Sequence, residues 1–348
     1  MDSRWVDYSV RARLKPAGQI GLSFCRKGRI SLGRRNKKGY PKGLNLLDWA
    51  GMAGRILVTG VSGPIGTALL PLLQSQGYNV VRLVRGPATG PNQISWNPAQ
   101  ALPPQAISGF EAVIHLAGES IVGRWTEDKK TRIRESRAQG TKHLCEGLAQ
   151  APTRPRVLIS GSAIGFYGDR GEEILTEDSA SGEGFLPSVC RDWEAATQPA
   201  LFSGIRTVNI RIGLVLSKSG GALQKMLLPF RMGAGGRVGT GRQWWSWIDV
   251  EDIVGAIHHI IKTDSVRGPI NLVAPNPVTN AEFTKALAQV LHRPAIFPVP
   301  AFAARLAFGQ MADELLLASQ RVSSKLASSG YAFQHSDLRT ALQDILHR

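Results

Sequence analysis

The chain has 348 residues, 43% of them hydrophobic, and no apolar run approaches the roughly 18 residues of a membrane span, so we expect a soluble protein with a large core. The formal net charge is +16, but residues 1–51 alone hold 12 Lys and Arg against 3 Asp and Glu. Three Cys without CxxC spacing support neither a disulfide framework nor a zinc site, and we expect no metal and a reducing, cytoplasmic compartment.

Residues 1–51 show no sustained helical or strand periodicity and end directly before a clear strand pattern. Three explanations stay open: translation from an upstream start codon, a basic arm for an anionic partner, or a targeting segment. The pair Arg34 and Arg35 resembles a twin-arginine signal, but no apolar segment follows it. We predict no specific nucleic-acid partner and treat the fold without this extension.

From Arg55 onward, short β-branched runs alternate with longer helical patterns. Helices are predicted over TALLPLLQSQG, over residues 127–149 and around DWEAAT, and strands over RILVTG, NVVRLVR, EAVIHLAG, RVLISGS, TVNIRIGLVL and PINLVA. Strands rich in Val, Ile and Leu without polar alternation indicate a parallel sheet that is covered on both faces. The prediction is an α/β, doubly wound Rossmann domain over residues 52–275.

After Pro275 the pattern changes to a helix that begins at Thr279 or Asn280, followed by PAIFPVP and two more helical segments. We therefore expect a small, mainly helical C-terminal lobe over residues 276–348, with about 220–248 also contributing to its substrate face. The lobe either closes over a cofactor or is a packing appendage.

The sharpest motif is VTGVSGPIG, which places Gly60, Gly63 and Gly66 directly after the first strand and at the start of a helix. In this context the glycines permit a tight turn, backbone approach to a pyrophosphate and close helix packing. The chain after the strand EAVIHLAG is expected to pass beside the same cofactor. The predicted contacts are Gly60, Ser62, Gly63, Ile65, Gly66, Leu116, Ala117 and Gly118.

The lack of an acidic residue at the end of the second strand indicates which dinucleotide would bind. NAD sites of this fold place an acidic residue at the end of the second strand, yet residues 67–110 contain no Asp or Glu. That strand offers Arg82 and Arg85 instead, and an Arg fork suits a 2′-phosphate. We predict NADP(H) as the cofactor, with Arg85, at the strand end, as the phosphate contact.

Other candidates follow neighbouring strands. His115 lies inside an apolar run and is predicted to be a buried core histidine, whereas Glu119 emerges at the ligand-binding end of its strand. Arg124 and Arg137 come next, and each is open to substrate contact or surface packing. Asp249 is expected to cap the helix that begins DIVGAIHHI.

Together, VTGVSGPIG, VIHLAGES, SGSAIGFYG and RIGLVLS resemble the extended short-chain dehydrogenase/reductase superfamily. GESI, CRDWEAA, LLPFRMGAGGRVGTG and WWSWIDVEDI look like its atypical epimerase-like branch, which carries a small C-terminal domain of unknown function. The resemblance implies a Ser at 162 and a catalytic Tyr and Lys four residues apart. Leu186 and Cys190 stand at those two positions, so the usual acid/base mechanism is not expected.

Candidates for the missing chemistry are Ser162 and Tyr167, which follow the same strand, while Cys190 is expected to be an inert buried thiol. Glu119, Arg124, Arg237 and Trp247 are the predicted substrate contacts. These residues favour an NADP(H)-dependent oxidoreductase or epimerase-like enzyme for an unidentified anionic small molecule, possibly nucleotide-linked. The alternative is a non-catalytic NADP(H)-binding sensor or scaffold, which a cell-division label on some relatives would suit.

Overall fold

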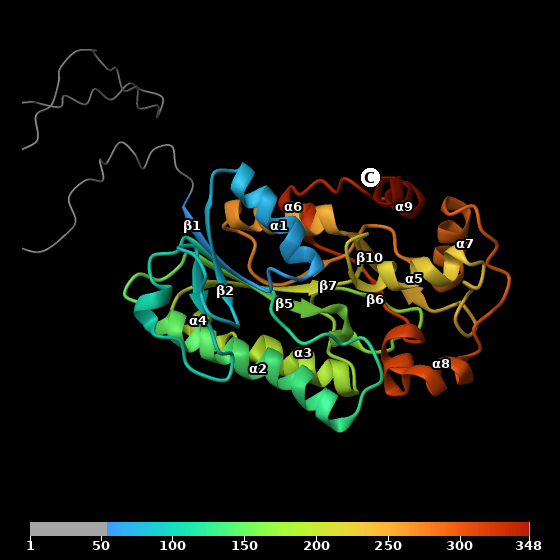
Figure 1. The fold of residues 1–348 in the computed structure, drawn as a ribbon, viewed down its shortest axis with the longest axis horizontal. Helices are drawn as coiled ribbons and strands as arrows, with labels where there is room; N and C mark the ends of the chain where they lie inside the picture. Colours follow the sequence, from blue (N-terminus) through green and yellow to red (C-terminus); the bar gives the residue numbers. More distant parts are fainter. Residues whose placement is uncertain (1–53, 348) are drawn as a thin grey trace, which may run out of the picture. The chain divides into compact units, whose positions relative to one another are not determined.

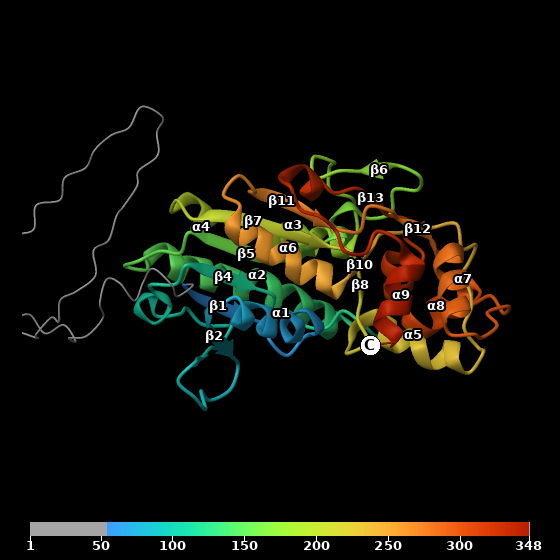
Figure 2. The same ribbon diagram turned by 90° about the horizontal axis from the view of Figure 1, so that it is seen from above.

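A computed structural model describes residues 54–347, so the expectations for residues 1–51, including Cys25, fall outside the described residues. Seven parallel strands form the central sheet in the order β11-β7-β5-β4-β1-β2-β3 (Figure 2). Their bounds are β1 (Arg55–Thr59), β2 (Asn79–Val84), β3 (Gln93–Ser95), β4 (Ala112–His115), β5 (Val157–Ala163), β7 (Arg206–Ile212) and β11 (Gly268–Leu272). The strand order reverses between β1 and β4, which is where doubly wound sheets bind ligands.

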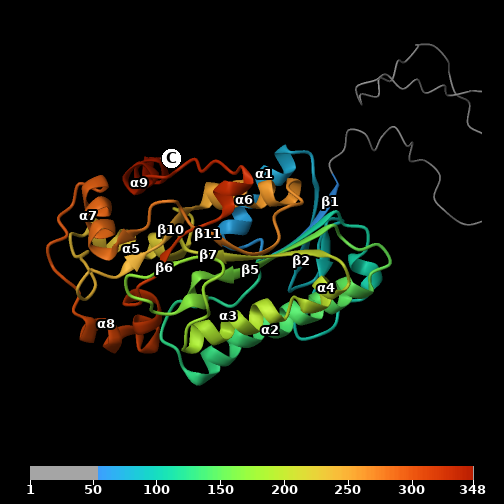
Figure 3. The same ribbon diagram turned by 180° about the vertical axis from the view of Figure 1, so that it is seen from behind.

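Helices cover both faces of this sheet (Figures 1 and 3). On one side lie α1 (Pro64–Ser75) and α6 (Val250–Lys262), and on the other α2 (Glu127–Gln150), α3 (Phe185–Ala195) and α4 (Gln198–Phe202). Each face of the sheet packs against its helices in a separate hydrophobic core. Successive residues of β1 point to opposite faces: Ile56 packs in the core with α1 and α6, whereas Leu57 packs in the core with α2 and α4. The predicted doubly wound α/β fold is confirmed.

Several boundaries follow the local chemistry of the sequence. Gly77, just beyond α1, has a φ of 82°, a conformation that favours glycine. The Asp249 carboxylate accepts the Glu251 N–H and caps α6 as predicted. Thr279 and Glu282 form a reciprocal capping box at α7 (Asn280–Val290), which selects Thr279 as the cap.

The run TVNIRIGLVL is two strands rather than the single predicted one. β7 ends at Ile212, and β8 (Leu214–Leu216) leaves the sheet to pair with β10 (Trp247–Asp249). A Cβ on Gly213 would lie 2.5 Å from the carbonyl oxygen of Ser246, so only glycine fits at this exit. The short strand β3 was not predicted.

Most of the remaining elements gather beyond the carboxyl ends of the strands (Figures 1 and 3). The helices are α5 (Gly221–Arg231), α7, α8 (Ala301–Phe308), α9 (Leu338–His347), the π-helix η4 (Ala312–Leu316) and three 3-10 turns, η2 (Pro104–Ile107), η3 (Ile164–Tyr167) and η5 (Leu326–Ser329). Two of these 3-10 turns lie elsewhere: η2 precedes β4 at its amino end, and η5 packs beside β11. The strand pairs are β9 (Trp244–Trp245) with β12 (Val278–Thr279), and β6 (Ile174–Leu175) with β13 (Arg321–Val322). None of the helices in residues 54–347 is long and apolar enough to cross a bilayer.

One hydrophobic core joins segments on both sides of residue 275. Leu227 of α5 and Trp247 of β10 pack in the same cluster as Phe283 of α7 and Leu342 of α9. We therefore propose that the C-terminal lobe comprises residues 276–348 together with α5, β8 and β10.

Candidate functional site

The turn between β1 and α1 has no room for side chains at two of its three glycines. Gly60 has a φ of 71°, and a Cβ there would lie 2.6 Å from the Leu116 carbonyl group. A Cβ on Gly66 would lie 2.4 Å from the Gly60 carbonyl oxygen. At Gly63 the nearest atom would be 3.4 Å away, which is ordinary contact. The space at Gly63 is therefore open to a ligand.

The first turn of α1 is suited to an anion. Gly63 is the N-cap and supplies no capping side chain, Pro64 is at the first position, and the first turn contains no acidic residue. Within the described residues, no hydrogen bond satisfies the N–H groups of Ile65 and Gly66, and Ser62 is exposed beside them. Free amides and the helix dipole attract phosphate, so this turn fits the pyrophosphate of a dinucleotide.

The buried side chain of His115 holds the carboxyl ends of the neighbouring strands β1 and β4 together. Thr59 Oγ1 accepts the N–H groups of Leu116 and Ala117, each at 3.1 Å, and lies 2.8 Å from His115 Nδ1. The other ring nitrogen of His115 lies 2.9 Å from Thr141 Oγ1. Burial lowers the pKa of His115 to about 4, so the imidazole is neutral near pH 7. His115 is a structural core residue, as predicted, and Leu116 and Ala117 present their backbone at the switch point.

Arg85 follows β2 directly, and its side chain is exposed. Within the described residues it forms no ion pair, although its charge contributes to the lowered pKa of Glu119. Arg82, by contrast, lies inside β2 and is half-buried. Arg85 is thus the better placed of the two for a phosphate at this edge of the site.

Glu119 is already engaged by protein groups. Its carboxylate accepts a hydrogen bond from Lys129 Nζ at 2.5 Å, and this bond is the main cause of its lowered pKa. Its N–H donates to Ser136 Oγ at 3.0 Å, and its carbonyl accepts from Arg137 at 3.0 Å. These bonds fix the chain beside Gly118, so Glu119 organises the loop after β4.

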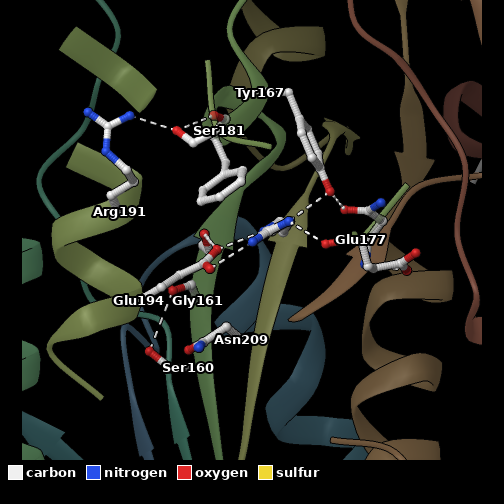
Figure 4. A network of polar contacts seen from close by, with 12 residues as sticks. Ser160, Gly161, Tyr167, Glu177, Ser181, Arg191, Glu194 and Asn209 are labelled. Atoms are coloured by element: carbon white, nitrogen blue, oxygen red, sulfur yellow. Dashed lines mark hydrogen bonds and ion pairs between the residues drawn. The ribbon is translucent and has the colours of Figure 1, made fainter. Parts of the chain in front are cut away.

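Figure 4 shows a polar network that includes Tyr167 and Glu194. Ser162, near the end of β5, belongs to this network. Its hydroxyl donates to Glu194 Oε1 at 2.7 Å, and Arg211 binds both carboxylate oxygens of Glu194 at 2.8 and 2.9 Å. The same guanidinium donates to Tyr167 Oη at 2.9 Å, and Tyr167 donates to Asn271 Oδ1 at 2.7 Å.

Tyr167 is buried, which argues against the predicted role as an acid or base. Its side chain has no exposed surface, its hydroxyl has partners on both sides, and burial raises its pKa. Aromatic packing by Phe166 closes the remaining space at a centroid distance of 5.4 Å. The reason is tertiary: Arg211 and Asn271, from β7 and β11, hold the hydroxyl in the interior.

Helix α3 carries the two residues that replace the expected Tyr and Lys. Burial raises the pKa of Cys190 to about 12, so its thiol is protonated and unreactive near pH 7, in line with the expectation of an inert thiol. Leu186 is buried and lines a cavity of about 490 Å³. Neither side chain can exchange a proton with a substrate at that pH.

This cavity lies between the Rossmann domain and the C-terminal lobe. The lobe contributes the carboxylates of Asp313 and Glu314, Thr240 and Gln243 come from the segment between α5 and β9, and Asp169 and Glu183 come from the chain before α3. The full lining is Gly165, Gly168, Asp169, Glu183, Leu186, Pro187, Gly239, Thr240, Gln243, Ala301, Arg305, Asp313, Glu314, Leu317 and Ala318. Its one arginine, Arg305, is paired with Asp313 at 2.8 Å, so the cavity offers hydrogen-bond acceptors more than positive charge.

The predicted substrate residues are not brought together. Trp247 is fully buried and donates its indole N–H to the Asn276 carbonyl, so it is a core residue and cannot provide a substrate surface. Arg124 is exposed and donates to the Leu306 carbonyl at 3.1 Å. Arg237 faces a second cavity of about 690 Å³, where the other basic residues are Lys285, His292, Arg293 and Arg339.

Sequence reasoning missed Arg211, whose bidentate bond to Glu194 organises the network, and Glu314, which reaches α3 from the lobe. Arg211 sits in an apolar strand, and an arginine in such a run signals a buried ionic partner. No short-range pattern identifies the role of Glu314. Among residues 54–347, no group of three or more His, Cys, Asp and Glu could hold a metal ion.

Comparisons with known proteins agree with this geometry. Residues 56–273 match the model of the NAD dependent epimerase/dehydratase family, and residues 299–345 match a domain of unknown function. An epimerase family protein of Mycobacterium bovis is 40% identical over 290 residues, which span 82% of this chain and 96% of that protein.

Two solved structures are similar as well. A human epimerase family protein crystallised with NADPH has a TM-score of 0.78 and 35% identity, covering 84% of this chain and 99% of that one. A nucleoside-diphosphate sugar epimerase from Corynebacterium glutamicum has a TM-score of 0.71 and 38% identity, covering 85% of this chain and 59% of that one. The Rossmann domain with its glycine turn, the family match and these relatives lead to one conclusion: the chain belongs to the NAD-dependent epimerase/dehydratase family.

Proposed function

We propose that the chain is an NADP(H)-dependent oxidoreductase or epimerase-like enzyme that acts on a small molecule. The observation that carries the proposal is the glycine turn, where a Cβ would fill the space at Gly60 and Gly66, followed by the free amides of α1. Arg85 and the lack of any acidic residue from 67 to 110 favour the 2′-phosphate of NADP(H). The NADPH in the human relative supports this choice.

A bound nicotinamide dinucleotide supplies or accepts hydride at the carbon of a carbonyl or alcohol. Ser162 lies at the end of β5, on the ligand-binding side of the sheet. Because its hydroxyl donates to Glu194, its lone pairs are free to accept a hydrogen bond from a substrate hydroxyl. Ser162 is 3% exposed and does not line the cavity beside Leu186, so it orients the substrate only if the bound substrate extends from that cavity toward the end of β5. The accompanying proton would then travel through Ser162 or water, since Leu186 and Cys190 exchange no proton near pH 7 and Tyr167 is buried.

The two cavities suggest how a substrate with an anionic group would lie. Its reactive, polar end would occupy the cavity lined by Leu186, where Thr240 and Gln243 offer uncharged hydrogen-bonding groups. Its anionic group would meet Arg237, which lies three residues before Thr240 and opens onto the basic cavity. A nucleotide-linked sugar has this division of charge, and it is the substrate class that we propose.

The test measures loss of NADPH absorbance, which reports net reduction, and the formation of epimers by chromatography, which reports redox-neutral turnover. The full chain is mixed with sugar nucleotides, with neutral sugars and with small aldehydes, each as a separate pool. We expect consumption in the sugar-nucleotide pool. Arg237→Gln should reduce that rate at least about tenfold, as loss of a charge-assisted hydrogen bond does. Lys218→Gln is the matched control, because that lysine lines neither cavity, and its rate should equal that of the wild type. Consumption restricted to the neutral pools would refute the anionic substrate.

A specific contact also favours a second candidate, a sensor that binds NADP(H) without turnover. The Glu314 carboxylate, from the C-terminal lobe, accepts hydrogen bonds from the N–H groups at the start of α3. A ligand-dependent movement of the lobe would therefore also move that helix. Tight NADPH binding, neither NADPH consumption nor epimer formation in any pool, and a change in protease sensitivity of the lobe would favour this candidate over the enzyme.

A further inference from the structure

Arg137 of α2 is pressed against the backbone at the end of β4. A Cβ on Gly118 would lie 3.1 Å from its Cζ atom, and Arg137 Nη1 donates to the carbonyls of Glu119 and Ile133 at 3.0 and 3.2 Å. On its other side the guanidinium lies 4.9 Å from the centroid of the Trp193 ring. These contacts fix the cation beside the chain that borders the switch point.

Among the described residues, no carboxylate forms an ion pair with this cation, although the charge of Glu119 acts on it from nearby. Its protein acceptors are two carbonyl oxygens, and the nearby carboxylate of Glu119 is bonded to Lys129 instead. The other cations of this corner do have acidic partners: Arg134 is paired with Asp192, and Arg211 with Glu194. Burial lowers the pKa of Arg137, yet an arginine keeps its charge in proteins. One positive charge without a direct acidic partner therefore remains here.

The sheet order places Arg137 on one side of the proposed cofactor. Arg85 follows β2, so the adenosine half with its 2′-phosphate would lie on the β2 side of β1. The nicotinamide half then extends over the opposite side, past β4 and β5. Gly118 follows β4, and Arg137 lies against it. Cys190 and Glu119 both influence the pKa of Arg137, but Cys190 is a neutral thiol and the Glu119 carboxylate is bonded to Lys129.

We propose that Arg137 makes the site select the reduced cofactor, NADPH, over NADP⁺. The nicotinamide ring carries a positive charge only in the oxidised form, so an unpaired cation beside it raises the free energy of bound NADP⁺ and leaves NADPH unaffected. With charges within about 10 Å and an effective dielectric constant of about 20, the preference is on the order of tenfold. This inference rests on the proposed NADP(H) site and assigns a specificity-determining role to a residue of α2.

The experiment is a calorimetric titration of the full chain with NADPH, NADP⁺ and 2′,5′-ADP, which has the adenosine half but no nicotinamide. Wild type should prefer NADPH to NADP⁺ about tenfold, which corresponds to about 30 mV for a two-electron couple. Arg137→Gln should bring that ratio close to one, and Arg137→Lys should keep it. Arg132→Gln, an exposed charge on the same helix, is the matched control and should behave as wild type.

Affinity for 2′,5′-ADP separates the outcomes. It should be the same in wild type and in all three variants if Arg137 acts on the nicotinamide half. An unchanged NADPH to NADP⁺ ratio in Arg137→Gln, or an equal loss of all three ligands, would overturn the inference while the NADP(H) site stands. Absence of binding by every ligand to the wild type would overturn the proposed function and this inference with it.

Discussion

The carboxylate of Glu314 accepts the backbone N–H of Leu186 at 2.7 Å, although 128 residues separate the two in the chain. It also accepts the N–H of Phe185 at 3.1 Å. The N-cap of α3 is Gly184, which has no side chain to satisfy these amides, so the C-terminal lobe supplies the cap. The helix that carries Leu186 and Cys190 is thereby tied to the lobe that closes the cavity.

Removing this cap should destabilise the protein. We expect Glu314→Ala to lower the free energy of unfolding by about 1 kcal/mol, the usual cost of losing an N-cap, as measured by urea denaturation. Glu183→Ala is the control, because Glu183 lies on the same cavity and is exposed. Equal stability of Glu314→Ala and the control would show that the lobe does not hold α3.

The glycine turn gives a matched pair of substitutions. Gly66→Ala places its Cβ 2.4 Å from the Gly60 carbonyl oxygen, so it should lower the thermal midpoint of unfolding. Gly63→Ala meets that oxygen only at 3.4 Å, so its midpoint should stay near the wild-type value. Its methyl group instead occupies the ligand space, and NADPH affinity should fall at least about tenfold. If Gly63→Ala binds NADPH normally, the pyrophosphate does not lie on this turn.

Tyr167→Phe should affect stability. The hydroxyl bonds Arg211 and Asn271 in the interior, and its loss leaves both short of a partner, at a cost of about 1 to 2 kcal/mol in the free energy of unfolding. Tyr78→Phe is the control, since the buried Tyr78 hydroxyl has no hydrogen-bond partner among the described residues. A folded Tyr167→Phe protein that has lost turnover alone would restore the catalytic role first predicted for Tyr167.

The neutral His115 should make stability depend on pH. Its folded pKa of about 4 lies below the ordinary value, so protons bind the unfolded chain preferentially and stability is lost as pH falls from about 6.5 towards 4. Between pH 7 and pH 5 this loss is about 2 kcal/mol. Urea denaturation at both pH values should show a smaller difference for His115→Gln than for wild type. The same pH difference in the variant would assign the effect to other groups.

Local chemistry made much of the fold predictable. The glycine turn, the strands rich in Val and Ile, the Asp249 cap and the Thr279 capping box all depend on residues close together in sequence. The split between β7 and β8 depends on contact between Gly213 and Ser246, 33 residues apart, and no apolar pattern reveals it. The prediction failed where long-range contact decided the structure.

In the candidate site, too, contacts between residues far apart in sequence could not be predicted. Tyr167 and Trp247 stand next to Gly-rich or polar stretches and looked accessible, but Asn271 and Asn276 supply the acceptors that let them be buried. The partners lie 104 and 29 residues along the chain, so sequence spacing could not identify them. The charge balance around Arg137 likewise depends on which acids pair with its neighbours, which only the folded chain determines.

The most direct test of the proposed function compares NADPH and NADH binding to the full chain by calorimetry, in the wild type and in Arg85→Gln. The wild type should bind NADPH at least about tenfold more tightly than NADH, because a guanidinium and a phosphate form a charge-assisted bond. Arg85→Gln should remove most of that difference by weakening NADPH alone. Equal affinities in the wild type, or no binding of either, would contradict an NADP(H) site at this turn.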